Sequence, residues 1–175
     1  MQHYRHNLVA GGTYFFTVNA IDRSSRVLVD EIAALRGAVS YVRGRLPFQI
    51  DAWVVLPDHL HCVLTLPLGD ADYPTRWRLI KSQFSRAVGG QAAASASRAS
   101  KQERGIWQRR YWEHTVRDQR DYAVHIDYVH FNPVKHGLVE RPDDWPYSTY
   151  KRAVARGFCA DGLGDAPDLS AAGER

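Results

Sequence analysis

The sequence predicts an α+β domain with a ferredoxin-like βαββαβ core, and three observations support this. Apolar, β-branched runs at residues 14–20, 48–56 and 60–66 are typical of strands. Amphipathic helical spacing follows the first and third of these runs. The order strand, helix, strand, strand, helix, strand is that of two split βαβ units, which form an antiparallel sheet with helices on one face. We expect one additional C-terminal helix, carrying Tyr128, and an extended tail.

The first half of the core begins after a glycine pair, Gly11-Gly12, with an aromatic-rich strand over residues 14–20. Asp30 then offers a helix cap, and Pro47 stops the helical pattern. The apolar positions of this expected helix are Ile32, Leu35, Val39 and Val42. The strands at 48–56 and 60–66 are separated by Pro57-Asp58, which predicts a tight antiparallel hairpin.

The second half begins with an expected amphipathic helix over residues 75–88, which Gly89 ends. Residues 90–105 lack bulky apolar side chains and are interpreted as a flexible insertion. A fourth strand is expected over residues 107–116, and Asp118 is expected to cap the helix that carries Tyr128.

Length and charge limit the class of protein. At 175 residues the chain fits one domain, expected over residues 1–158 and followed by an acidic, mobile tail at 159–175. The tail has a net charge of −3, so residues 1–158 carry +7 against a total of +4, which favours a polyanionic partner. Cys62 and Cys159 are too few for a secreted disulfide scaffold, and no segment approaches the ~20 apolar residues of a membrane helix. We expect a cytoplasmic protein without a membrane partner.

His59 and His61 are the first candidate site residues. They lie at the end of an apolar run, and a strand places residues i and i+2 on one face, so both imidazoles should point the same way. Two neutral imidazoles can bind a divalent ion if a third ligand comes from elsewhere. One exposed and one backbone-bonded histidine is the alternative.

Tyr128 and Asn132 stand four residues apart in an expected helix, which places the phenol and the amide on one face. Packed over residues 60–66, this helix would bring both groups to the imidazoles. Such a group can cut a phosphodiester, because a nearby cation or base favours the phenolate of a tyrosine nucleophile. Tyr122 is a rival on a different helical face, where packing is its expected role.

Asn132 is a candidate third ligand, because an amide oxygen favours Mg²⁺ or Mn²⁺ over zinc. It precedes Pro133, however, and proline disfavours helical backbone at the residue before it, so Asn132 can instead cap a helix that ends or kinks there. His125, on the same face as Tyr128, and His136, one turn beyond Asn132, are the alternative third ligands.

Basic residues alternate with aromatic ones in three places, a mixture that favours single-stranded nucleic acid or hairpin junctions. The residues expected to contact DNA are Arg76, Arg78, Lys81, Arg109, Arg110, Lys151 and Arg152. For Trp77, Trp107 and Trp112 taken singly, a place in the core is the favoured interpretation.

Several of these segments together resemble the REP-associated tyrosine transposases, a branch of the HUH single-tyrosine nucleases related to insertion-sequence transposases. The motifs that carry the resemblance are Gly11-Gly12-Thr13, residues 53–61, Trp107-Gln108, residues 111–114, Asp127-Tyr128, residues 132–139 and residues 144–148. Their order and spacing are far more specific than any one of them, and the likeness runs from about Tyr4 to Ala155.

The resemblance implies that His59 and His61 are metal ligands, Tyr128 is the nucleophile and Asn132 the third ligand, with Mg²⁺ or Mn²⁺ as cofactor. It also implies cleavage and rejoining of single-stranded DNA at repetitive extragenic palindromic (REP) hairpins through a 5′-phosphotyrosine. The insertion at 90–105 is longer than the family pattern. A hairpin-binding regulator without catalysis and a water-using metallohydrolase are the alternatives, and between monomer and homodimer the monomer is favoured.

Overall fold

The computed structural model describes residues 7–89 and 105–158, and the insertion at 90–105 and the tail at 159–175 therefore lie almost wholly outside the described residues. The elements are β1 Thr13–Asn19, α1 Val27–Asp30, α2 Ile32–Arg45, β2 Gln49–Val55, β3 His59–Thr65, α3 Tyr73–Val88, β4 Trp112–Thr115, α5 Gln119–Lys135, the 3₁₀ turn η1 Pro142–Asp144 and α6 Tyr150–Ala155. None of the described helices is long and apolar enough to cross a membrane.

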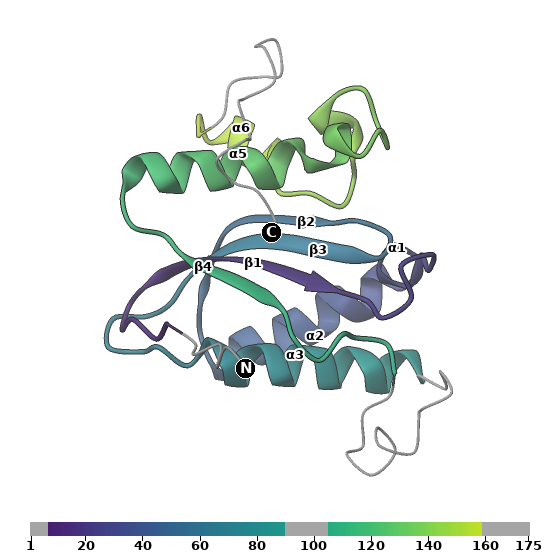
Figure 1. Ribbon diagram of the computed structural model, residues 1–175, viewed down its shortest axis with the longest axis horizontal. Coiled ribbons are helices and arrows are strands. Elements are labelled where there is room, and N and C mark those ends of the chain that lie inside the picture. The colour runs from purple at the N-terminus through teal and green to yellow at the C-terminus, as the bar shows by residue number, and fades with distance from the viewer. Residues whose placement is uncertain (1–6, 90–104, 159–175) are drawn as a thin grey trace, which may run out of the picture.

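The four strands form one antiparallel sheet in the order β2-β3-β1-β4. This is the arrangement that two split βαβ units produce, so the ferredoxin-like prediction is confirmed. Helices α2 and α3 cover one face of the sheet, and α5 covers the other (Figure 1). The helix with Tyr128 therefore packs on the face of the sheet opposite the two helices of the core.

The strand starts depend on local backbone requirements. Gly11 adopts φ +68°, and a Cβ at Gly12 would lie 2.8 Å from the carbonyl oxygen of Val9 and 2.9 Å from the hydroxyl of Tyr14. Only glycine fits both positions without strain, which explains the pair before β1. The hairpin at Pro57-Asp58 is confirmed, with the amide of Leu56 donating to the carbonyl of His59 at 2.8 Å.

Three boundaries differ from expectation. Asp30 is the last residue of α1 and caps nothing, because a separate short helix precedes α2. The fourth strand is only Trp112–Thr115, and Trp107 makes a single bridge to Ala20. Helix α5 does not end at Asn132 but continues through Pro133 to Lys135. Pro133 is buried in the last turn of the helix, and helical bonding continues past it, with the amide of His136 donating to the carbonyl of Asn132 at 3.0 Å.

Candidate functional site

The paired histidines lie on the face of the sheet covered by α5. His59 and His61 are both buried, with ring centroids 4.9 Å apart. In the β3 ladder His61 pairs with Thr17 of β1 on one side and Val54 of β2 on the other. The sequence prediction that both imidazoles occupy one face is confirmed by these neighbours, because Val54 belongs to the same apolar cluster as Tyr128.

Hydrogen bonds fix the orientation of both rings. Nδ1 of His59 lies 2.7 Å from Oδ1 of Asp58, whose Oδ2 is 2.7 Å from Nε of Arg23. Nδ1 of His61 lies 2.8 Å from the Thr17 hydroxyl. Metal-binding histidines commonly have one ring nitrogen engaged in this way. Coordination by either ring would therefore use Nε2.

Burial also sets the charge of His61. Loss of hydration and the proximity of His59 hold the pKa of His61 well below its ordinary value. The ring is therefore a neutral imidazole at physiological pH, which is the form that binds metal.

Helix α5 places Asn132 one turn after Tyr128, which contacts His61, and one turn before His136, which contacts His59. The rings of Tyr128 and His61 are 5.2 Å apart in an edge-to-face arrangement. Asn132 is fully buried, and within residues 7–89 and 105–158 neither its Oδ1 nor its Nδ2 has a hydrogen-bond partner. A buried amide without partners costs free energy, and a cation is one partner that would satisfy its oxygen.

Lys135 and His136 border this group, and both are exposed. Lys135 donates to the Tyr128 hydroxyl at 3.4 Å and its ammonium lies 4.6 Å from the ring centroid. The ring of His136 is 5.1 Å from that of His59. Tyr128 itself is only 1% exposed, so the phenol is covered. The sequence analysis did not identify Lys135 as a site residue. Its spacing from Tyr128 could have indicated it, because seven residues are two helical turns and place both side chains on one face of the helix.

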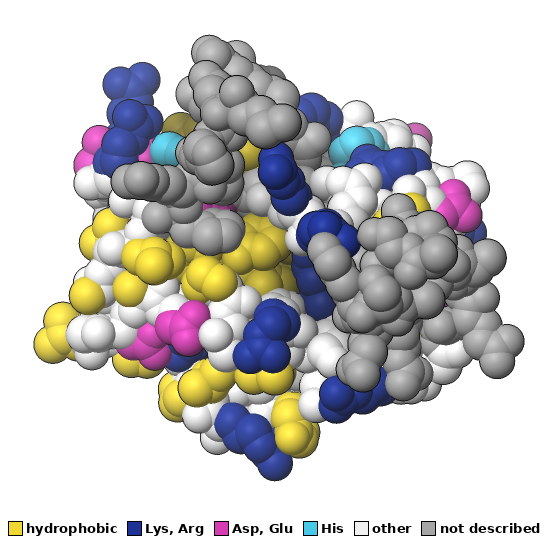
Figure 2. Space-filling view, turned by 60° about the horizontal axis from the view of Figure 1, so that its bottom comes forward, with side chains coloured by type: hydrophobic (Ala, Val, Ile, Leu, Met, Phe, Trp, Pro, Cys, Tyr) yellow, Lys and Arg dark blue, Asp and Glu magenta, His cyan; other side chains and the backbone are white. Residues whose placement is uncertain are grey.

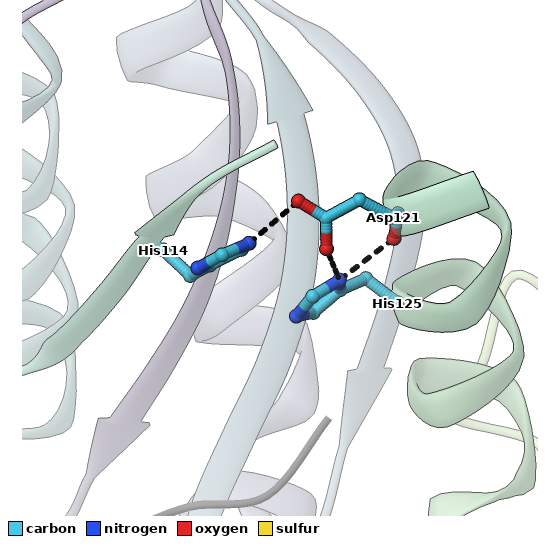
Figure 3. Close-up of side chains that lie close together, drawn as sticks. All are labelled: His114, Asp121 and His125. Atoms are coloured by element: carbon cyan, nitrogen blue, oxygen red, sulfur yellow. Dashed lines mark hydrogen bonds and ion pairs between the residues drawn. The ribbon is translucent and has the colours of Figure 1, made fainter. Parts of the chain in front are cut away.

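His125 lies in a second group with His114 and Asp121, whose ligand atoms all lie within 4.8 Å of one another, and its role as an alternative third ligand stays a prediction. Its Nδ1 lies 2.8 Å from the backbone carbonyl oxygen of Asp121 and 3.1 Å from the Asp121 carboxylate, which also meets Nε2 of His114 at 2.8 Å (Figure 3). Burial opposes ionisation, but hydrogen bonds from His114 and the Arg117 amide lower the pKa of Asp121 to about 2. This network joins β4 to the start of α5.

The expectation that Arg76 contacts DNA is wrong. Its side chain is 2% exposed, with a bidentate ion pair to Asp70 at 2.6 and 3.1 Å. The guanidinium also donates to the carbonyl oxygens of Leu46, Pro47 and Asp72. Every donor direction is thus used inside the protein. Lys81 is also engaged, donating to the Gln108 carbonyl at 2.9 Å.

The remaining basic candidates are exposed: Arg78, Arg109, Arg110, Lys151 and Arg152. Trp77 is buried as expected, whereas Trp107 and Trp112 are only partly buried. Figure 2 shows Lys and Arg side chains spread over the face it presents, interspersed with hydrophobic ones. On that face, charge therefore does not single out a nucleic-acid path.

The arrangement unites three kinds of chemical group. Two oriented imidazoles and a buried amide oxygen can hold a divalent cation, a phenol can act as a nucleophile, and an exposed ammonium beside the phenol can stabilise negative charge. This combination suits displacement at a phosphodiester.

Comparisons with known proteins agree on one family, although no protein-family model matches the chain. A REP-associated tyrosine transposase of Escherichia coli K12 is 48% identical over 176 residues, covering 100% of this chain and 98% of the relative. A Haemophilus influenzae protein assigned to the same group is 41% identical, covering 99% of each chain. A solved REP-associated tyrosine transposase bound to a REP hairpin superimposes with a TM-score of 0.86 at 48% identity, covering 100% and 98% of the two chains.

Proposed function

The chain belongs to the REP-associated tyrosine transposases, enzymes that cut and rejoin DNA, and from that premise we propose that it acts on single-stranded DNA beside REP hairpins. The observation that carries the site assignment is the pair of ring contacts that α5 makes with β3, Tyr128 to His61 and His136 to His59, because Asn132 lies one helical turn from each of these α5 residues. We further propose the cytoplasm as its compartment.

Tyr128 is the proposed nucleophile. Its oxygen forms a bond to phosphorus while the bond from phosphorus to the 3′ oxygen breaks, which leaves a 5′-phosphotyrosine and a strand with a free 3′ end. The phenol loses its proton and the departing 3′ oxygen gains one. Rejoining is the reverse attack by a 3′-hydroxyl, and the phosphotyrosine conserves the bond energy for it.

His59, His61 and Asn132 are the proposed holders of Mg²⁺ or Mn²⁺. The donor set fits such an ion, because both rings are oriented through Nδ1 and the Asn132 oxygen has no hydrogen-bond partner among the described residues. A bound divalent cation would polarise the scissile phosphate and orient its leaving oxygen.

Lys135 is proposed to stabilise the negative charge that develops on the phenol oxygen as it attacks. Because Tyr128 is covered, the phosphate reaches the phenol only when Lys135 and the adjoining chain move aside as DNA binds. Exposed basic residues, among them Arg78, Arg109 and Arg110, are proposed to hold the hairpin phosphates.

Denaturing electrophoresis tests the proposal. The purified chain is incubated with a labelled REP hairpin oligonucleotide and MnCl₂, and a covalent protein–DNA adduct is expected to survive denaturant. Tyr128→Phe should abolish both adduct and cleavage while native-gel binding persists, and Tyr122→Phe on the same helix is the matched control. Full cutting by Tyr128→Phe would refute the assignment.

The burial of Tyr128 favours one second candidate, a hairpin-binding regulator without turnover. It predicts a mobility shift on a native gel with no adduct at any Mn²⁺ concentration. Cleaved product without an adduct would instead indicate a water-using metallohydrolase.

A further inference from the structure

A groove of about 500 Å³ lies on the side of the sheet opposite to Tyr128, between α2, β2 and residues 147–152. Its volume is within the range of about 300–1,000 Å³ that small-ligand pockets occupy. Its apolar part is formed chiefly by Ile32, Val39, Ile50, Trp53 and Tyr147. None of the residues assigned to the reaction lines it.

The charged side chains that line this groove are all positive. Arg36, Arg43 and Arg152 line it, each of them exposed, and no Asp or Glu among the described residues does. Arg43 donates through Nε to the Phe48 carbonyl, and Arg152 donates through one Nη to the Ile50 carbonyl. These bonds orient both guanidinium groups beside the groove and leave their other nitrogens as donors for an anion.

An apolar pocket with aromatic walls and arginines around it matches one kind of occupant on a DNA-processing protein. A base can enter the apolar part while the arginines bind its phosphates, because stacking and backbone charge together hold single strands. A smooth duplex has no unstacked base to insert. The chemistry therefore favours a single strand over the paired stem of a hairpin.

The position of the groove relative to the reaction site fits the same interpretation. Val55 lines the groove, while His59 begins the next strand after the Pro57-Asp58 turn. Val54, the neighbour of Val55, faces the opposite side with Tyr128. Residues 145–149 run along the outer edge of β2, where Ser148 bridges to Val54, so a strand that leaves the reaction site would cross this segment to enter the groove.

We infer that this groove, lined by Arg36, Arg43, Trp53 and Tyr147, binds an unpaired nucleotide of the single strand that flanks the hairpin. The inference rests on the proposed function, which supplies the DNA. It assigns this flank, as distinct from the stem, to a second site on the far face of the sheet.

Two helical glycines allow a matched test. A Cβ at Gly44 or at Gly37 of α2 would meet no atom within 4 Å, but only Gly44 lines the groove. Gly44→Glu therefore places a negative charge among the arginines without a clash, and Gly37→Glu makes the same change of charge on the same helix. The double variant Arg36→Ala/Arg43→Ala removes the guanidinium groups proposed to bind phosphate.

Fluorescence anisotropy on the full chain measures Kd for a REP hairpin with and without a short single-stranded 5′ arm, and for the same hairpin with a 3′ arm. The ratio of the Kd without an arm to the Kd with the preferred arm is the readout. Gly44→Glu and the double variant should each lower this ratio about tenfold. The double variant should also reduce the salt slope by about 0.7 for each phosphate that it no longer neutralises.

Photo-cross-linking with 5-iododeoxyuridine in the arm provides a direct measurement, and the expected adducts are on Trp53 or Tyr147. An unchanged ratio in both variants, or adducts confined to other surfaces, would overturn the inference while leaving cleavage at Tyr128 intact. Failure of the proposed function is distinguishable, because the unmodified chain would then bind neither hairpin nor armed DNA, or would bind without forming an adduct. An equal loss in Gly37→Glu would attribute the effect to net charge and likewise overturn the inference.

Discussion

Replacing Asp58 with asparagine tests how the proposed metal site is held. The Asp58 carboxylate makes two contacts of 2.7 Å, one to Nδ1 of His59 and one to Nε of Arg23, and it is 15% exposed. Asparagine has nearly the same volume but no charge. It therefore weakens the orientation and basicity of His59 without opening a cavity.

The expected loss of metal affinity follows from the role of Asp58, which orients a histidine ligand without binding the metal itself. Its loss typically costs about 10–100-fold in metal affinity, which corresponds to about 1.4–2.8 kcal/mol. The ion pair with Arg23 contributes little to folding, about 1 kcal/mol or less, because the Arg23 side chain is 49% exposed and readily hydrated. The effect should thus fall on metal binding and hardly on stability.

Isothermal titration with MnCl₂ measures the affinity, and Asp30→Asn serves as the control because the exposed Asp30 carboxylate pairs only loosely with Arg26, at 3.8 Å. Cleavage by Asp58→Asn should be weak at limiting Mn²⁺ and recover as Mn²⁺ is raised. Wild-type Mn²⁺ affinity in Asp58→Asn would refute the reasoning, as would a cleavage defect that excess Mn²⁺ does not correct.

Three other perturbations have defined outcomes. Arg76→Ala should lower the free energy of unfolding in urea by about 3 kcal/mol, since it leaves the Asp70 carboxylate and three carbonyls without their donor; a loss below about 1 kcal/mol would contradict this. Lys135→Met should slow single-turnover cleavage about 100-fold and Lys135→Arg less, because charge on the Tyr128 oxygen loses its nearby cation; equal rates in all three proteins would exclude the role. Burial lowers the pKa of His130 to about 4, below the unfolded value near 6.5, so the unfolded chain takes up the proton first. The stability that this neutral ring contributes is complete above pH 6.5 and declines as the pH falls toward 4, by up to about 3 kcal/mol. In His130→Gln the free energy of unfolding in urea should therefore depend less on pH over this range. An unaltered slope would contradict the neutral state of His130 in the folded protein.

Local periodicity determined the main features of the core. The alternation in β1, the hairpin at Pro57-Asp58 and the amphipathic pattern of α3 are properties of short segments, and each was predicted close to its observed bounds. The i, i+2 spacing of His59 and His61 likewise required only that the segment be a strand. The four-residue spacing of Tyr128 and Asn132 required only a helix.

The length of the fourth strand was predicted wrongly because it depends on how many residues of β1 are placed to pair with it. Residues 107–116 have the composition of a strand, but only Trp112–Thr115 pair with β1, over Tyr14–Thr17. Ahead of them the chain contacts the end of β1 only through single bonds such as the one from the Gln108 amide to the Asn19 carbonyl. A strand extends only as far as a neighbouring strand pairs with it, and the composition of one segment does not show where the other segment lies.

By itself the sequence determined which chemical groups this protein carries and on which local faces they stand, because helical and strand periodicity act over a few residues. Only the tertiary structure decided their neighbours. Arg76 and Arg78 look equivalent in sequence, yet Arg76 is buried against Asp70 and two carbonyls of the segment between α2 and β2, while Arg78 is exposed. The contact of Tyr128 with His61, and that of Asp121 with His114, depend in the same way on how α5 packs across the sheet, since contacts between distant segments are set by the shape of the whole core.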